Sequence, residues 1–155
     1  MRKMLLSFKP NVYEKIYNGV KIFEHRRNFP DEPIMAYMYV SKPVRAITGI
    51  VYLNNRHKLI DWEQEFKTDK EALERIHEYM KSYRYAMEIA EFKETNEISL
   101  DDLKRDIKGF VAPQSYFYLD NNPELLKYIE DRIILKDVTI THLFDEIKAE
   151  DVCVH

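Results

Sequence analysis

Cysteine is almost absent from this chain, which has one such residue, Cys153, in 155. A single cysteine cannot form an internal disulfide, so the sequence lacks the framework of a disulfide-rich secreted domain. Zinc-binding Cys-His spacing is missing as well. Cys153 and His155 together supply two ligands at most, and we expect a solvated tail there, with no metal site and no cofactor.

Glycine is nearly as scarce, with three residues, and neither a GxGxxG motif nor a P-loop is present. Phosphate binding by a glycine-rich cradle is therefore unsupported. Long apolar runs are also missing, since no stretch approaches the ~20 residues of a membrane span. Leu5 and Leu6 belong to a run too short for a signal-peptide core. We expect a cytoplasmic protein with no membrane partner.

Neither sign of charge dominates, because 24 Lys and Arg oppose 27 Asp and Glu for a net charge of −3. This balance argues against a protein that coats nucleic acid indiscriminately. The distribution is uneven, since residues 1–30 hold seven Lys or Arg and two Glu. Two interpretations remain: an acidic ligand near the N-terminal segment, or a basic face that balances acidic helices elsewhere.

Apolar and aromatic residues are plentiful: hydrophobic residues make up 45% of the chain, with 11 Tyr and 8 Phe. This length and composition predict a single domain spanning residues 1–155. Periodicity and turn residues divide the chain into short elements. Strands are predicted over residues 4–8, 21–29, 34–40, 44–54 and 83–92, with a short extended segment over 116–119. Helices are predicted over 10–18, 61–81 and 123–133, with Asp69 as a cap between two pieces of the second, and a capping box that begins at Ser99 opens a further short helix. Residues 137–148 are predicted to be a short strand or helix.

The predicted order is strand, helix, several strands, inserted helices, strand and helix. Few residues separate the first strands, and crossover helices of regular length are missing. An α+β fold with a small mixed β-barrel flanked by helices therefore fits better than a doubly wound sheet. Gly19 is expected to end the first helix in a left-handed conformation, and Gly49 to form a bulge in a strand.

The segment after Gly19 has the most informative pattern, GVKIFEHRR. Side chains alternate along a strand, so we predict that Phe23 faces the barrel interior while Glu24 and Arg26 face a solvent-filled cleft. Lys21 is expected at the lip of that cleft. Glu24 can hold Arg26 ready for a phosphate or a base edge. The same pattern is typical of an exposed ion pair that contributes about 0–1 kcal/mol.

His25, by the same alternation, points away from Glu24, and we expect it to be a packed core histidine. Aromatic residues near the end of the strand region, Tyr116 and Tyr118, also have two interpretations. They could stack a nucleobase or belong to the core.

The segment GVKIFEHR resembles the ASCH signature G-x-K-x-x-E-x-R. Further motifs of one branch of that family follow in the same order, so the resemblance covers residues 4–119 and leaves out residues 120–155. The matching motifs are LLSFKP at 5–10, SKPV at 41–44, ITG at 47–49, YAMEI at 85–89 and PQSYFYL at 113–119.

The resemblance implies a PUA-like barrel whose cleft binds RNA, or a nucleotide or nucleoside. The signature strand and the segment after the first helix would form this cleft. The ligand-binding residues that it implies are Lys9, Lys21, Glu24, Arg26, Gln114 and Ser115. We add Ser41 to the predicted ligand-binding residues, because Ser41 or Ser115 could supply a hydroxyl for hydrolysis.

Some members of the family are small amidohydrolases that act on acetylated cytidine, with a threonine nucleophile where this chain has Glu24. Glutamate is a poor nucleophile toward an amide, because its acyl product is a reactive anhydride. Other members are ribonucleases, for which Lys21 and Glu24 would be the catalytic cation and general base.

Three functions therefore stay open. The first is an RNA- or nucleotide-binding protein, and the second is a hydrolase of a modified nucleoside or RNA. The third is an interaction scaffold built on Tyr- and Met-rich helices. Residues 135–155 also have two possible placements, against the barrel or against a second copy in a homodimer.

Overall fold

A computed structural model describes residues 1–155. Its seven strands belong to one sheet with the order β2-β5-β4-β3-β1-β6, and β7 pairs with β5. The strands are β1 (Arg2–Phe8), β2 (Phe23–Arg26), β3 (Ile34–Val40), β4 (Ala46–Lys58), β5 (Tyr85–Ser99), β6 (Tyr116–Tyr118) and β7 (Leu135–Thr141). The helices are α1 (Pro10–Tyr17), α2 (Leu59–Glu65), α3 (Lys70–Met80), α4 (Leu100–Asp106) and α5 (Pro123–Arg132), with 3₁₀ turns η1 (Leu119–Asn121) and η2 (Ala149–Asp151).

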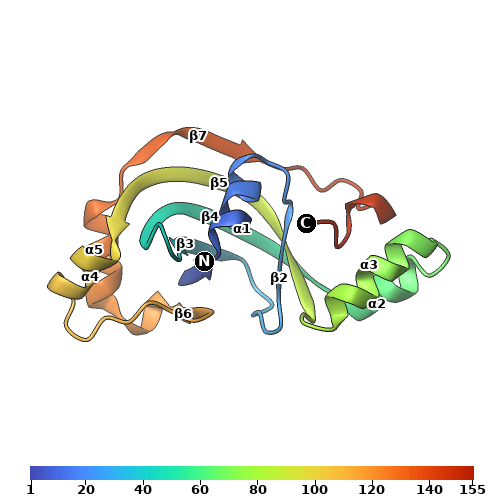
Figure 1. The fold of residues 1–155 in the computed structure, drawn as a ribbon, viewed down its shortest axis with the longest axis horizontal. Coiled ribbons are helices and arrows are strands. Elements are labelled where there is room, and N and C mark those ends of the chain that lie inside the picture. The colour runs from blue at the N-terminus through green and yellow to red at the C-terminus, as the bar shows by residue number, and fades with distance from the viewer.

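The sheet is mixed, because β1 pairs parallel to β3 while the other pairings are antiparallel. Its long central strands, β4 and β5, change register three times along their pairing, and such bulges bend a strand. The sheet therefore curls into a half-barrel, with α4 and α5 at one end and α2 and α3 at the other (Figure 1). The predicted α+β class and mixed, helix-flanked sheet are confirmed, as an open half-barrel.

Local signals place the helix ends correctly. Asp69 accepts a hydrogen bond from the Ala72 N–H and begins α3, and Ser99 does the same for Asp102 at the start of α4. The predicted helix over 61–81 is accordingly two helices that meet near Asp69. Gly19 follows α1 with φ of +76°, as predicted. None of the helices is long and apolar enough to cross a membrane.

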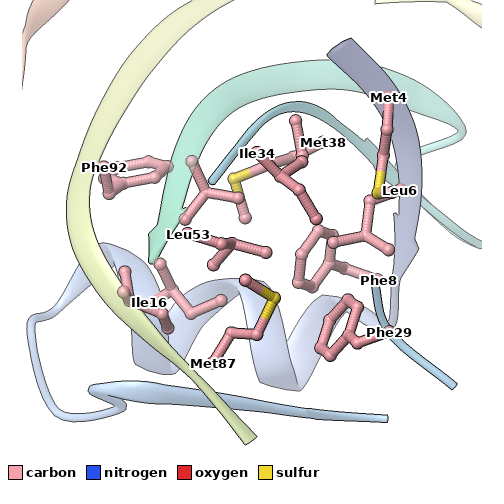
Figure 2. Close-up of a cluster of buried hydrophobic side chains, with 13 residues drawn as sticks. Met4, Leu6, Phe8, Ile16, Phe29, Ile34, Met38, Leu53, Met87 and Phe92 are labelled. Carbon is pink, nitrogen blue, oxygen red and sulfur yellow. The ribbon is translucent and has the colours of Figure 1, made fainter. Parts of the chain in front are cut away.

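The main apolar cluster lies on the concave face of the sheet. Met4, Leu6 and Met38 come from the strands, and Ile16 of α1 packs against them within the curve (Figure 2). The alternate residue Leu5 points to the opposite face, where it joins a second cluster with α4 and α5. Alternate side chains of β1 therefore face two apolar layers, which explains why Met4, Leu5 and Leu6 are apolar in succession.

Phe23 does not face the barrel interior, and that prediction is wrong. Glu24 pairs across the sheet with Met87, a member of the concave cluster, so Phe23 points to the outer face. There it packs on Trp62 of α2, with ring centroids 5.0 Å apart, in a third cluster with α3 and residues 152–153. The inserted helices cover this outer face of β2 and give it a core of its own.

The expected solvated tail is also wrong. Val152 and Cys153 are buried at 0% and 1% exposure. Arg75 of α3 holds this segment by donating hydrogen bonds to the carbonyl oxygens of Ala149 and Val152. Because β7 pairs with β5, residues 135–155 lie against the sheet, the first of the two placements. Pairing with a second copy stays a prediction.

Gly49 lies where both of its neighbouring strands shift register, as the predicted bulge requires. A Cβ atom there would approach Cε1 of buried Phe92 to 2.8 Å and the Lys93 carbonyl oxygen to 3.2 Å. We expect Gly49→Ala to lower the free energy of unfolding by about 1–3 kcal/mol, the usual cost of overpacking. Urea unfolding measures the change.

Gly109→Ala is the matched control. Gly109 has φ of +74° with nothing within 4 Å of an added Cβ, so it carries only the backbone cost, about 1–2 kcal/mol. A loss below about 0.5 kcal/mol in Gly49→Ala, which carries no left-handed backbone cost, would show that the contact with Phe92 relaxes freely.

Candidate functional site

A cavity of about 800 Å³ opens where the start of α1, strand β2 and the turn after α3 meet. Six of the seven predicted ligand-binding residues line it, namely Lys9, Lys21, Glu24, Arg26, Ser41 and Gln114. The seventh, Ser115, does not line the cavity but accepts a hydrogen bond from Arg26 Nη1, which does, at 3.3 Å. The fold thus brings together residues that are far apart in the sequence.

Strand pairing explains this convergence. Parallel β1 and β3 end side by side, and the Ser41 N–H donates to the Phe8 carbonyl at 3.0 Å, which sets Ser41 beside Lys9. Strand β6 runs antiparallel to β1, so the segment that enters it lies against the end of β1. There the Ser7 N–H donates to the Ser115 carbonyl at 2.8 Å, and Gln114 reaches the same cavity.

Arg26 is held by hydrogen bonds from three directions. Its Nε donates to Glu24 Oε1 at 3.3 Å, its Nη2 to the Ser7 carbonyl at 2.6 Å and its Nη1 to Ser115 Oγ. The guanidinium also lies 5.3 Å from the centre of the Phe8 ring. A guanidinium has five N–H groups, so about two remain for a ligand.

Glu24 is nearly buried, with 5% of its surface exposed. One carboxylate oxygen accepts from Arg26, but the other, Oε2, is buried and has no hydrogen-bond partner in the protein. Leaving a buried acceptor unpaired costs about 1–3 kcal/mol, and more for a charged group. This oxygen is therefore an unsatisfied acceptor, closed to solvent, on a side chain that lines the cavity.

Lys21 is buried at 5% exposure, so the prediction that it lies at an exposed lip is wrong. Its Nζ lies 3.0 Å from the main-chain oxygen of His155, to which it donates, and 3.4 Å from His25 Nδ1. Burial lowers the pKa of Lys21, and nearby Arg26 lowers it further, whereas Glu24 raises it. The tail that covers Lys21 lies more than 130 positions away in the sequence, which local patterns do not reach.

His25 is a packed histidine, as expected, but it also lines the cavity. Strand β2 is the last strand of the sheet and pairs only with β5, so the cavity reaches both of its faces around the free edge. His25 meets Tyr79 of α3 edge to face, with ring centroids 4.8 Å apart. Tyr83, in the turn after α3, lines the same cavity.

These two tyrosines were not among the predicted site residues. Their spacing of four residues suits one side of a helical turn, but nothing in the sequence places α3 beside β2. Tyr116 and Tyr118, the tyrosines predicted either to stack a base or to belong to the core, do not line the cavity. Tyr116 stacks on Phe29 at 6.3 Å, and Tyr118 lies under the guanidinium of Arg2.

Four cations and two carboxylates line the cavity. No group of three His, Cys, Asp or Glu side chains is placed to hold a metal ion. The charged residues that line it are Lys9, Lys15, Lys21, Arg26, Glu24 and Glu78.

Three similar solved structures relate this geometry to known proteins. The ASCH protein from Zymomonas mobilis superposes with a TM-score of 0.64 and 20% identity, over 86% of this chain and 96% of that chain. A serine-to-alanine variant of that protein superposes with a TM-score of 0.60 and 21% identity, over 83% of this chain and 95% of that chain. A tyrosine-to-phenylalanine variant superposes with a TM-score of 0.60 and 19% identity, over 86% of this chain and 100% of that chain. No family model and no curated protein matches the sequence. The half-barrel therefore has the fold of these ASCH proteins.

Burial lowers the pKa of His25 well below 6.5, and the ammonium of Lys21 lowers it further. Below about pH 6.5 the unfolded chain binds a proton that the native histidine does not, so the free energy of unfolding must fall as pH decreases. Burial also lowers the pKa values of His142 and His155, which act in the same direction.

We predict that His25→Gln reduces the slope of the free energy of unfolding against pH by up to about 1.4 kcal/mol per pH unit. Urea unfolding at several pH values between about 5 and 7.5 measures the slope. His77→Gln, at an exposed position of α3, is the control substitution. A slope unchanged by His25→Gln would show that this histidine titrates alike in the folded and unfolded chains.

Proposed function

We propose that this chain binds a nucleotide, either free or as part of a single-stranded RNA, in the cavity around Glu24 and Arg26. The observation that supports this most is the unpartnered, buried oxygen of Glu24, a residue that lines a cavity of about 800 Å³. Cavities of roughly 300–1,000 Å³ are typical of small-molecule sites. A ligand N–H would satisfy Glu24 Oε2 once a rotation of the carboxylate turns this oxygen toward the cavity.

The acceptor suits a base with an amino group. Carboxylates in proteins accept hydrogen bonds from the exocyclic amine of cytosine. Gln114, on the opposite segment of the wall, offers a donor and an acceptor from one amide. A base held between Glu24 and Gln114 would be read by its hydrogen-bonding edge.

The cations suit the phosphate of the same ligand. Lys9 and Lys15 line the cavity near α1, and neither forms an ion pair within the protein. Arg26 adds its unused N–H groups. A surplus of cations in a concave site raises the local concentration of anions.

The aromatic wall from Tyr79 and Tyr83 completes the site. Proteins that bind single-stranded RNA stack unpaired bases on such rings and read their edges by hydrogen bonds. The ASCH fold and the signature residues Lys21, Glu24 and Arg26 point to the same class of ligand.

A hydrolase is the second candidate, and the state of Lys21 favours it. An amine whose pKa is lowered by burial is a better general base near neutral pH. Ser41 lines the same cavity, and its hydroxyl makes no hydrogen bond with the protein. Modified nucleosides and RNA are the substrates that the resemblance implies for such chemistry.

Arg26→Ala tests the location of the site. The change removes a charge-assisted hydrogen bond and should weaken binding of ribonucleoside monophosphates roughly 10- to 100-fold. Arg26→Lys should recover only part of that loss, because lysine lacks the planar fork. Thermal shift with the four monophosphates identifies the ligand, and calorimetric titration gives the affinities. Equal binding by Arg26→Ala and the unchanged protein would place the ligand elsewhere.

Glu24→Gln separates binding from catalysis. The amide keeps the shape of the side chain, so a binder should retain affinity for inorganic phosphate but lose selectivity among bases. A hydrolase that uses Glu24 should lose turnover by roughly 100-fold or more while it still binds. Chromatography of acetylcytidine and of a short RNA after incubation with the protein measures turnover. Absence of products with both substrates, together with nucleotide binding, would exclude the second candidate for these substrates.

A further inference from the structure

A second, smaller cavity of about 350 Å³ lies beside the first, at the base of the hairpin formed by α2 and α3. Tyr83 lines both cavities and so forms a shared wall between them. Its side chain is among the exposed large hydrophobic groups, at 38% exposure. A ligand that leaves the first cavity over this ring would enter the second.

The second cavity has an apolar lining with a basic rim. Leu59, Ile60 and Met80 contribute apolar surface, and Ile60 is 56% exposed. Lys58 and Arg84 are the charged residues that line it, and both are exposed and free of ion pairs. No carboxylate is present in this lining.

The backbone holds the two cations in place. The Leu59 N–H donates to the Arg84 carbonyl at 3.0 Å, and Lys58 pairs with Tyr85 across the sheet. The Arg84 N–H donates to the carbonyl of Arg26 at 3.2 Å, which ties the second cavity directly to the signature strand. The relative position of the two cavities is therefore fixed by the sheet and does not depend on a loose loop.

We propose that the second cavity is the subsite for the neighbouring nucleotide of a single-stranded RNA whose first nucleotide occupies the cavity around Glu24 and Arg26. The proposal rests on the proposed function and narrows its ligand to an oligonucleotide. A base stacks on Tyr83, and Lys58 and Arg84 bind the phosphate of the connecting or following nucleotide. Proteins that bind single strands combine stacking rings with a basic groove in this way.

The charge of the lining favours RNA over an apolar peptide. A peptide segment would bury Ile60 and Met80 but would leave two neighbouring cations without partners. A polyanion would pair with both cations, and the adjoining basic cavity would bind another part of the same polyanion. Continuity between two cavities of the same sign is what a chain of phosphates requires.

The test compares a fluorescein-labelled RNA hexamer of mixed sequence with the four ribonucleoside monophosphates. We expect the hexamer to bind at least tenfold more tightly than any monophosphate. In the double variant Lys58→Gln with Arg84→Gln, hexamer affinity should fall at least fivefold. The slope of log affinity against log salt should decrease by about 0.7, because the one phosphate contact that is lost on a single strand contributes about that much. Monophosphate affinity should stay within twofold.

The matched control is the double variant Lys104→Gln with Lys108→Gln. These exposed lysines lie in and just after α4, at the opposite end of the sheet, and line neither of the two cavities. The charge change is identical, so a general electrostatic effect would appear in both double variants. A melting curve for each protein confirms that it is folded.

Tyr83→Ala should weaken hexamer binding roughly 5- to 100-fold through lost stacking, and Tyr83→Phe should restore it. If monophosphates bind but the hexamer binds no more tightly, or if the Lys58 and Arg84 changes have no effect, the second subsite is refuted while the proposed function stands. If neither RNA nor monophosphate binds, both fall. If an acidic, Leu-rich nonapeptide binds at Lys58 and Arg84 and the hexamer does not, the cavity serves a protein partner.

Discussion

The site depends on the hydrogen bonds of the Arg26 guanidinium, because they join the two ends of an open sheet. Arg26 belongs to β2, at one end of the strand order, and its other partners are Ser7 of β1 and Ser115 next to β6, at the opposite end. A half-barrel with no strand pairing across this gap needs another connection, and one side chain provides it. The same connection forms the wall of the larger cavity, so the residue that helps to close the fold is also the one best placed to meet a ligand.

The burial of the charged side chains of Glu24 and Lys21 costs folding free energy when no ligand is bound. Replacing a buried ion pair by apolar residues is often neutral or stabilising, so such a pair is weak evidence for a purely structural role. Here the carboxylate keeps an unpartnered oxygen, and burial lowers the pKa of the nearby amine. Perturbed and incompletely bonded groups in a cavity are typical of functional sites, which is why the geometry favours a ligand over a simple surface ion pair.

Features that depend on neighbours in the sequence were predicted well. Strand β3 occupies the predicted residues 34–40, Asp69 and Ser99 cap their helices, and Gly19 has the expected positive φ. Features that depend on packing between segments far apart in the sequence were not predicted. The alternation of side chains in β2 correctly placed Phe23 and Glu24 on opposite faces of the strand, but it could not predict which face the inserted helices would cover. Lys21 was misplaced because the segment that buries it lies at the other end of the sequence.

The candidate site followed the same division. The polar residues of the larger cavity were predicted from the resemblance to the ASCH family, and strand pairing explains their proximity, because it fixes where the ends of β1, β3 and β6 meet. Tyr79 and Tyr83 were missed, since they belong to an inserted hairpin whose position against β2 is set by packing around Phe23 and Trp62. That packing supplies the aromatic wall and the second, basic cavity at once. The inserted helices therefore help to line both cavities at the edge where β2 is open, and under the proposed function the length of a ligand would be read there and not by the signature residues.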